Sequence, residues 1–349
     1  MRHNSPTTAG NFARRLVVRI LQTVGAQTCC ALRAHRTFLG AASLRPYLAI
    51  IALFVATTAH AESSELAPLA ARALLLDIAR AGNQLVAVGD HGHVLLSTDN
   101  GKTWTQALTP TRTMLTGVTF ADALHGWAVG HDGVILATND GGKTWTHQDD
   151  GKNLDTIFLD VLFLDAQHGF VVGAYGKFLV TTDGGKTWTP HKPAAEEVHY
   201  NRISAGPAGE LYLAGESGTV LVSADHGKSW TRCEVPYEGS LFGVLALDEA
   251  SLVAYGLRGH ILQSPDHGAT WEPLNSELKV LIMAGCKMKN GTVVLAGQGG
   301  NFFVSRDAGH TFKSWQSPGF GTSVADLLEA DDGSLVTVGE AGAIRVQLP

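Results

Sequence analysis

The sequence has little of what several functional classes need. Only four cysteines occur in 349 residues, and no C-x-x-C pair follows residue 61, so a thiolate zinc site is not expected. No helical periodicity of useful length follows residue 61, apart from a short ambiguous stretch at 66–79. The 40 glycines are instead typical of many short strands joined by tight turns.

Basic clusters are also missing from most of the chain. Residues 1–61 carry seven arginines and no acidic residue. The remainder therefore has 19 Lys and Arg against 32 Asp and Glu, a net charge of −13. Because phosphate binding needs clustered Lys and Arg, this balance argues against a nucleic-acid partner.

The first 61 residues predict a leader with a secretory signal peptide. An apolar run of h-region length spans Leu48 to Ala56, Arg45 precedes it, and Ala59-His60-Ala61 provides a small-x-small site with cleavage after Ala61. The run is too short to span a bilayer. A start codon placed too early and a bipartite organellar leader both account for the long stretch before it. We expect a periplasmic or secreted protein, or a thylakoid-lumen protein in a photosynthetic host.

The main feature of residues 62–349 is an internal repeat. An eight-residue Asp-box segment, first seen at Ser97–Trp104, occurs six times with periods of 41, 43, 42, 41 and 41 residues. Its carboxylates and closing aromatic residues are Asp99 and Trp104, Asp140 and Trp145, Asp183 and Trp188, Asp225 and Trp230, Asp266 and Trp271, and Asp307 and Phe312.

A second motif gives the number of repeats. The pattern G-x-x-G precedes each Asp box and occurs a seventh time at Gly339 and Gly342, just before the chain ends. Each unit reads as four short strands separated by turn signals, and a period near 40 is typical of a propeller blade. The fold class is therefore all-β, a seven-bladed β-propeller of four-stranded antiparallel blades with Asp-box turns.

The last blade has sequence for three strands only. We expect the segment around 64–70 to supply the missing outer strand, because an open sheet edge can pair with other chains. A disulfide between Cys233 and Cys286 is open to a protein in an oxidising compartment. It is disfavoured because it needs Cα atoms within roughly 7 Å, and the repeat register puts the two cysteines in non-adjacent blades.

The Asp boxes are predicted to be structural. Their glycine suits a backbone with positive φ, and their Asp can accept N–H bonds within its own turn. As turns between the third and fourth strands, they lie on one face of the propeller.

The G-x-x-G turns lie on the opposite face. Their central residues differ between blades, so a partner-binding face is expected there. The candidate residues are Asp90, His91, His131, Asp132, Tyr175, Glu216, Arg258, Gln298 and Glu340. The first four have metal-capable side chains, but a solvated acidic rim is the interpretation that we adopt, and no metal or cofactor is predicted.

Three features together resemble a known family. They are the repeated G-x-x-G, the I-L-x-T and D-G-G-K-T-W motifs, and the stretch Gly126-Trp127-Ala128-Val129-Gly130. Over nearly all of 73–349 the chain is similar to the photosystem II stability and assembly factors, with a bacterial relative expected.

The resemblance implies an exported, non-catalytic protein that binds a membrane-protein complex of the envelope or thylakoid. It touches the membrane only through that partner, and we expect a monomer. The photosynthetic members use an arginine-rich patch, whereas the eight arginines of residues 62–349 are spread over the repeats.

The alternative is a carbohydrate-active propeller, either lectin-like or a glycoside hydrolase such as a sialidase. Sialidases need an arginine cluster and a tyrosine nucleophile. Tyr200-Asn201-Arg202-Ile203 is the only trace of their arginine motif, and it lacks the following proline. Among the turn residues only Tyr175 offers an aromatic ring for a sugar, so a protein partner is favoured and no catalytic residue is assigned.

Overall fold

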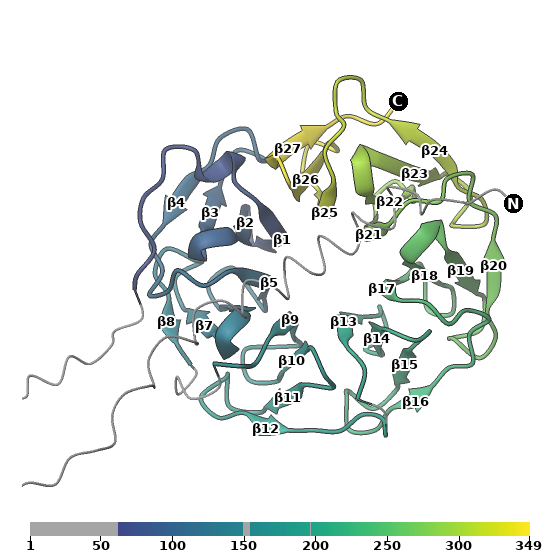
Figure 1. The fold of residues 1–349 in the computed structure, drawn as a ribbon, viewed down its shortest axis with the longest axis horizontal. Helices are drawn as coiled ribbons and strands as arrows, with labels where there is room; N and C mark the ends of the chain where they lie inside the picture. Colours follow the sequence, from purple (N-terminus) through teal and green to yellow (C-terminus); the bar gives the residue numbers. More distant parts are fainter. Residues whose placement is uncertain (1–61, 149–153, 196) are drawn as a thin grey trace, which may run out of the picture. The chain divides into compact units, whose positions relative to one another are not determined.

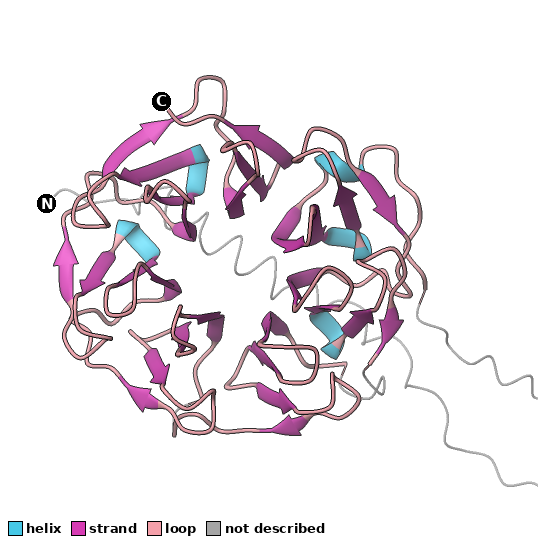
Figure 2. Ribbon diagram, turned by 180° about the vertical axis from the view of Figure 1, so that it is seen from behind, coloured by secondary structure: helices cyan, strands magenta, loops and turns pink. Residues whose placement is uncertain are grey.

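The computed structural model describes residues 62–148, 154–195 and 197–349, and these form a seven-bladed β-propeller (Figure 1). The predicted leader and its cleavage site lie outside the described residues. Within the described part, no helix is long and apolar enough to cross a membrane. Viewed from behind, the described chain consists of strands and loops with only short single-turn helices (Figure 2).

Each blade is an antiparallel sheet whose strands follow the chain order from the centre outward. The first blade contains β1 (Leu75–Ala81), β2 (Gln84–Gly89), β3 (Val94–Ser97) and β4 (Thr105–Ala107). The second contains β5 (Leu115–Phe120), β6 (Gly126–Gly130), β7 (Ile135–Thr138) and β8 (Thr146–His147). The third contains β9 (Phe158–Phe163), β10 (Gly169–Gly173), β11 (Phe178–Thr181) and β12 (Thr189–Pro190).

The next three blades repeat this plan. Blade four contains β13 (Tyr200–Ala205), β14 (Leu211–Gly215), β15 (Val220–Ser223) and β16 (Thr231–Arg232). Blade five contains β17 (Leu241–Ala246), β18 (Leu252–Gly256), β19 (Ile261–Ser264) and β20 (Glu272–Leu274). Blade six contains β21 (Ile282–Lys287), β22 (Val293–Gly297), β23 (Asn301–Ser305) and β24 (Lys313–Gln316).

Blade seven is a three-stranded sheet of β25 (Val324–Glu329), β26 (Leu335–Gly339) and β27 (Gly342–Val346). The second strand of a blade is the most deeply buried, and every residue of β6, β10, β14 and β26 is buried. Both faces of this strand pack against neighbouring blades, which explains its uninterrupted apolar sequence. The hydrophobic core is therefore divided into layers between blades.

Aromatic residues fill one of these layers between blades two and three. The rings of Trp127 and Phe163 stack with centroids 3.4 Å apart, and Trp188 of the Asp box meets Phe163 edge-on at 5.9 Å. The Asp-box residue Trp188 therefore takes part in the packing between these two blades.

The segment that we expected to complete blade seven lies elsewhere. Residues 62–69 form no strand. Ser64 N–H donates to the Thr109 carbonyl at 2.9 Å, and Ala67 N–H donates to Gln106 Oε1 at 2.8 Å. This segment therefore lies along the outside of blade one, and the helical turn η1 (Ala70–Arg72) then leads into β1.

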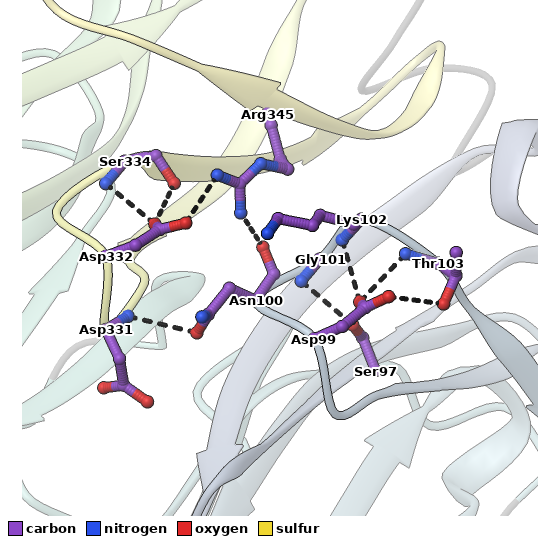
Figure 3. Close-up of polar contacts among 10 residues, drawn as sticks. All are labelled: Ser97, Asp99, Asn100, Gly101, Lys102, Thr103, Asp331, Asp332, Ser334 and Arg345. Carbon is purple, nitrogen blue, oxygen red and sulfur yellow. Dashed lines mark hydrogen bonds and ion pairs between the residues drawn. The ribbon is translucent and has the colours of Figure 1, made fainter.

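The seam between blades seven and one is closed by side chains instead of a shared sheet (Figure 3). Arg345 of blade seven donates to the Asn100 carbonyl of blade one, and Asp331 N–H donates to Asn100 Oδ1 at 3.2 Å. Asp332 of the same blade as Arg345 pairs with its guanidinium at 2.8 Å. Beneath these bonds an apolar cluster joins Leu75 and Leu85 of blade one to Val336 of blade seven.

Candidate functional site

Backbone bonds confirm how the turns are divided between the two faces. The last glycine of a G-x-x-G turn donates to the loop that leads into the next blade: Gly133 N–H bonds Thr156 at 2.8 Å, and Gly176 N–H bonds Val198 at 2.8 Å. On the other face, the Asp-box residue His267 donates to the Ala250 carbonyl at 2.8 Å, in the loop between the first two strands of its own blade. The G-x-x-G turns and Asp boxes therefore occupy opposite faces, as predicted.

The first variable residue of several G-x-x-G turns is turned toward its own blade. Glu216, Gln298 and Glu340 each accept a backbone N–H where the chain enters the first strand. Their donors are His199 at 3.3 Å, Leu281 at 3.4 Å and Ser323 at 3.1 Å. A common bond in three blades indicates that these three candidates hold the turn, which sequence reasoning did not separate from binding.

The second variable residue projects into solvent. His91, Asp132, Tyr175 and Arg258 have left-handed backbones with φ between 54° and 59°. Glycine has this conformation at less cost, and blade six has Gly299 in the equivalent place. Tyr175 is 61% exposed and its ring meets His199 edge-on at 4.6 Å. These outward side chains are the part of the predicted face that is free to contact a partner.

The four metal-capable residues do not form a metal site. His91 pairs with the neighbouring Asp90 at 3.0 Å, whereas Asp132 accepts from Thr113 Oγ1 at 3.2 Å. His131 is buried, which lowers its pKa, and its Nε2 has no hydrogen-bond partner among the described residues. Within the described part of the chain, no group of three His, Cys, Asp or Glu side chains is placed to hold a metal ion.

The Asp boxes use their carboxylates internally. In blade three, Asp183 accepts from Thr181 Oγ1 at 2.8 Å, from Thr187 N–H at 2.9 Å and from Thr187 Oγ1 at 2.6 Å. These bonds stabilise the ionised form and lower the pKa of Asp183 to about 2. The same bonds recur in the other boxes, which supports the structural role that their sequence predicts.

A charged cluster at the centre of the ring was missed by sequence reasoning. Arg202 of β13 pairs with Asp326 of β25 at 2.9 Å and with Asp77 of β1 at 3.5 Å. Asp160 of β9 also lies in this cluster and accepts N–H bonds from Val161 and Ile203. The sequence signal is positional, because all four residues are third in the innermost strand of their blade.

Burial governs the protonation of this cluster. Burial and the nearby charge of Asp326 raise the pKa of Asp77 well above its usual range. Burial raises the pKa of Asp160 to about 6, against the opposing effect of Arg202. Because the guanidinium of Arg202 is already bound by carboxylates, it is not available to bind a substrate carboxylate as a sialidase arginine would.

The two cysteines of the described chain are free. Cys233 follows β16 in blade four and Cys286 lies in β21 of blade six, so the two thiols lie in non-adjacent blades. Burial raises the pKa of Cys286 to about 12, which keeps this thiol protonated.

Comparison with family models identifies the repeat architecture. The model described as photosynthesis system II assembly factor YCF48 matches residues 104–156 and 150–347, and a BNR/Asp-box repeat model matches 95–106. The chain belongs to the YCF48 family. A search of the curated proteins finds no match.

Solved structures show the same fold. A structure titled "YCF48 bound to D1 peptide" matches with a TM-score of 0.67 and 20% identity, covering 82% of this chain and 97% of that one. YCF48 from Cyanidioschyzon merolae matches with a TM-score of 0.64 and 18% identity, over 82% of this chain and 98% of that one. The WD40 propeller domain of Doa1 matches with a TM-score of 0.62 and 12% identity, over 82% of this chain and 95% of that one. The YCF48 family is thus a family of assembly factors built on this propeller.

Proposed function

We propose that this protein is an exported, non-catalytic assembly factor that binds a segment of a membrane-protein complex. Membership of the YCF48 family carries this proposal. A similar structure holds a D1 peptide, which makes a polypeptide the expected ligand here as well. Export follows from the predicted signal peptide in residues 1–61.

The chemistry of the described residues supports binding over catalysis. The Asp-box carboxylates are saturated by turn bonds, and the central carboxylates are engaged with Arg202 or with backbone N–H groups. The G-x-x-G face instead presents exposed side chains from rigid turns, of types that are frequent at protein interfaces, such as Tyr175 and Arg258. We therefore propose that this face contacts the partner.

The test is capture of the membrane complex from detergent extracts with tagged residues 62–349, followed by cross-linking mass spectrometry. One complex should be enriched, with cross-links from Lys177 and Lys192 on the G-x-x-G side of blade three. Cross-links concentrated on Lys186 and Lys228 of the Asp boxes would contradict the assignment of this face, and no enrichment would contradict the function.

Matched variants sharpen this test. Tyr175→Ala and Arg258→Glu change side chains that project outward, and we expect at least a tenfold loss of captured complex. Lys228→Glu, on the opposite face, is the control and should leave capture unchanged. Glu216 and Glu340 are unsuitable for this test because their carboxylates bond the backbone of their own blades.

A further inference from the structure

The outer edge of blade seven has an empty strand position. Blades one to six each carry a fourth strand of two to four residues. In the described part of the chain, no strand pairs with the outer side of β27, which Figure 1 shows as the outermost strand of its blade. Ala343 is only half-buried, whereas the equivalent residue of each of the six other blades, such as Ile135 of β7, is buried.

The pairing within blade seven determines which backbone groups face outward. Gly339 pairs with Gly342 across a two-residue turn, and Thr337 pairs with Ile344. Because bonded and non-bonded pairs alternate along an antiparallel ladder, the N–H and C=O of Ala343 and Arg345 point to the outer edge. The edge also lacks the usual protection, since the Arg345 side chain is bound to Asn100 across the seam and to Asp332 within its own blade.

A cleft adjoins the end of this edge. It has a volume of about 400 Å³ and is lined by Val304, Trp315, Lys313, Arg306 and Pro349, among others. Val304 is equivalent to Leu96 of blade one, against which the Asp-box glycine Gly142 of blade two packs. The cleft is therefore equivalent to the place beside blade one that the Asp-box turn of blade two occupies.

The polar side chains of the cleft are largely engaged within the protein. Arg306 donates to the Pro349 oxygen at 2.7 Å, and Asp307 is bound within its own Asp box by Ser305 and Thr311. Val304 and Trp315 leave the cleft an apolar wall, so the empty strand position and the cleft together fit an extended chain with one large apolar residue.

We propose that β27 and this cleft bind an extended segment of the partner polypeptide as the fourth strand of blade seven, antiparallel to β27. Strand addition to an exposed edge supplies backbone hydrogen bonds, and the cleft selects one large apolar side chain. The identity of the ligand as a polypeptide rests on the proposed function. The strand site is separate from the G-x-x-G face and adds a second contact to it.

The site can be tested without knowing the partner, by using a copy of the missing element as the probe. The synthetic peptide DHGATWEPL repeats residues Asp266–Leu274, which form the Asp-box turn and outer strand β20 of blade five. Its binding to residues 62–349 is followed by amide hydrogen exchange. We expect at least tenfold slower exchange for the N–H groups of Ala343 and Arg345, and little change for those of Ile344 and Val346.

Two controls isolate the strand pairing. In blade five, Glu272 pairs with Gln263 and Leu274 pairs with Ile261, and these two partners are equivalent to Arg345 and Ala343 of blade seven. A peptide that is N-methylated at the residues copied from Glu272 and Leu274 therefore cannot donate its N–H groups to β27 and should not bind. Ala343→Pro removes an outward N–H of the protein and should abolish the protection, whereas Ala343→Val keeps that N–H and should bind the peptide normally.

Three results would overturn the proposal. The first is unchanged exchange of Ala343 and Arg345 at millimolar peptide, or equal binding by Ala343→Pro. The second is protection that rises with protein concentration alone, which would assign the edge to a second copy. The third is protection that is present in the full chain without peptide but lost in residues 62–349, which would assign it to the chain's own first 61 residues.

The two functional proposals fail in different ways. If Ala343→Pro captures the membrane complex as well as the unmodified protein does, the strand site is wrong and the assembly function stands. If the unmodified protein captures no complex, the assembly function is wrong, and the peptide experiment still decides whether β27 accepts a strand.

Discussion

Single residues at the centre of the ring contribute to stability in a way that depends on pH. Arg202 neutralises only part of the charge of Asp77, Asp160 and Asp326, and the side chains of Asp77 and Asp326 are each only 9% exposed. Buried carboxylates without full compensation take up protons more readily than they do in water. In the folded protein, carboxyl groups of this cluster therefore stay protonated at pH values at which they are ionised in the unfolded chain.

Asp160 provides the test of this proton uptake. Its pKa is about 6 in the folded protein and near 3.8 in the unfolded chain, so folding binds a proton between about pH 4 and 6. The free energy of unfolding should therefore fall as the pH rises through this window, with a contribution from Asp160 of about 3 kcal/mol, since one pKa unit is worth about 1.4 kcal/mol. Urea unfolding of the protein and of Asp160→Asn at pH 4.5, 5.5 and 7 measures it.

The comparison between the two proteins isolates Asp160. Burial lowers the pKa of His93 and His131, and these groups change stability with pH in the opposite direction. The variant should lose the part of the pH dependence that Asp160 causes and keep the rest. Identical pH profiles for the two proteins would show that Asp160 is ionised throughout the range.

At the scale of elements, the turns are held in place by close backbone contacts. Gly342 begins β27 with φ of 79°, and a Cβ atom built there would lie 2.0 Å from the Ala71 carbonyl oxygen. Since Ala71 belongs to the helical turn η1, this contact joins the last strand to the segment that enters blade one. The outer segment 62–72 thus helps to close the ring without forming a strand.

Two glycines separate this contact from backbone strain. Both glycines have a positive φ, which is costly for alanine. Gly342→Ala also creates a clash with Ala71, whereas at Gly333, with φ of 78°, no atom lies within 4 Å of the new Cβ. Gly333→Ala should lower the free energy of unfolding by about 1 kcal/mol, and Gly342→Ala should lower it by a further 1 to 3 kcal/mol, roughly the cost of overpacking. Equal midpoints in urea for the two variants would show that η1 moves away freely.

The regular elements could be predicted from sequence because every blade repeats the same physical requirements. Positive φ demands Gly142 or Gly185 in an Asp box, and a strand packed between two blades demands an apolar run such as 169–173. The central cluster could not be predicted in this way, because the residue type at its position is not constant among the repeats. Asp77, Asp160, Arg202 and Asp326 share their position with Gly117, Gly243 and Ala284, and only the fold shows that these positions meet.

The closure of the ring was the other feature beyond sequence reasoning. An open edge on blade seven suggested a fourth strand from 64–70, but Ser64 and Ala67 bond blade one instead. Sequence also could not separate Glu216 and Glu340, which hold turns, from Tyr175 and Arg258, which project outward. Each of these outcomes depends on which neighbouring backbone group a side chain reaches.

For the whole molecule, the seam between blades seven and one should be the first part to open. Unlike the layers between other blades, it joins segments that are distant in sequence, and its polar contacts through Arg80, Arg345 and Asp331 are partly exposed. Native-state hydrogen exchange should show lower opening free energies for β25–β27 than for β9–β11 in the middle of the chain. Uniform values around the ring would indicate that the propeller opens only by global unfolding.

The absence of a shared sheet at the seam has a consequence for how such a protein evolves. Among the residues that the structure describes, each blade is one continuous stretch of chain, and no blade takes a strand from a distant part of the sequence. An in-frame duplication or deletion of 41 to 43 codons therefore adds or removes a whole blade without cutting any sheet in two. After such a change, the ring can close only if the blades that become neighbours pack well against each other around the centre.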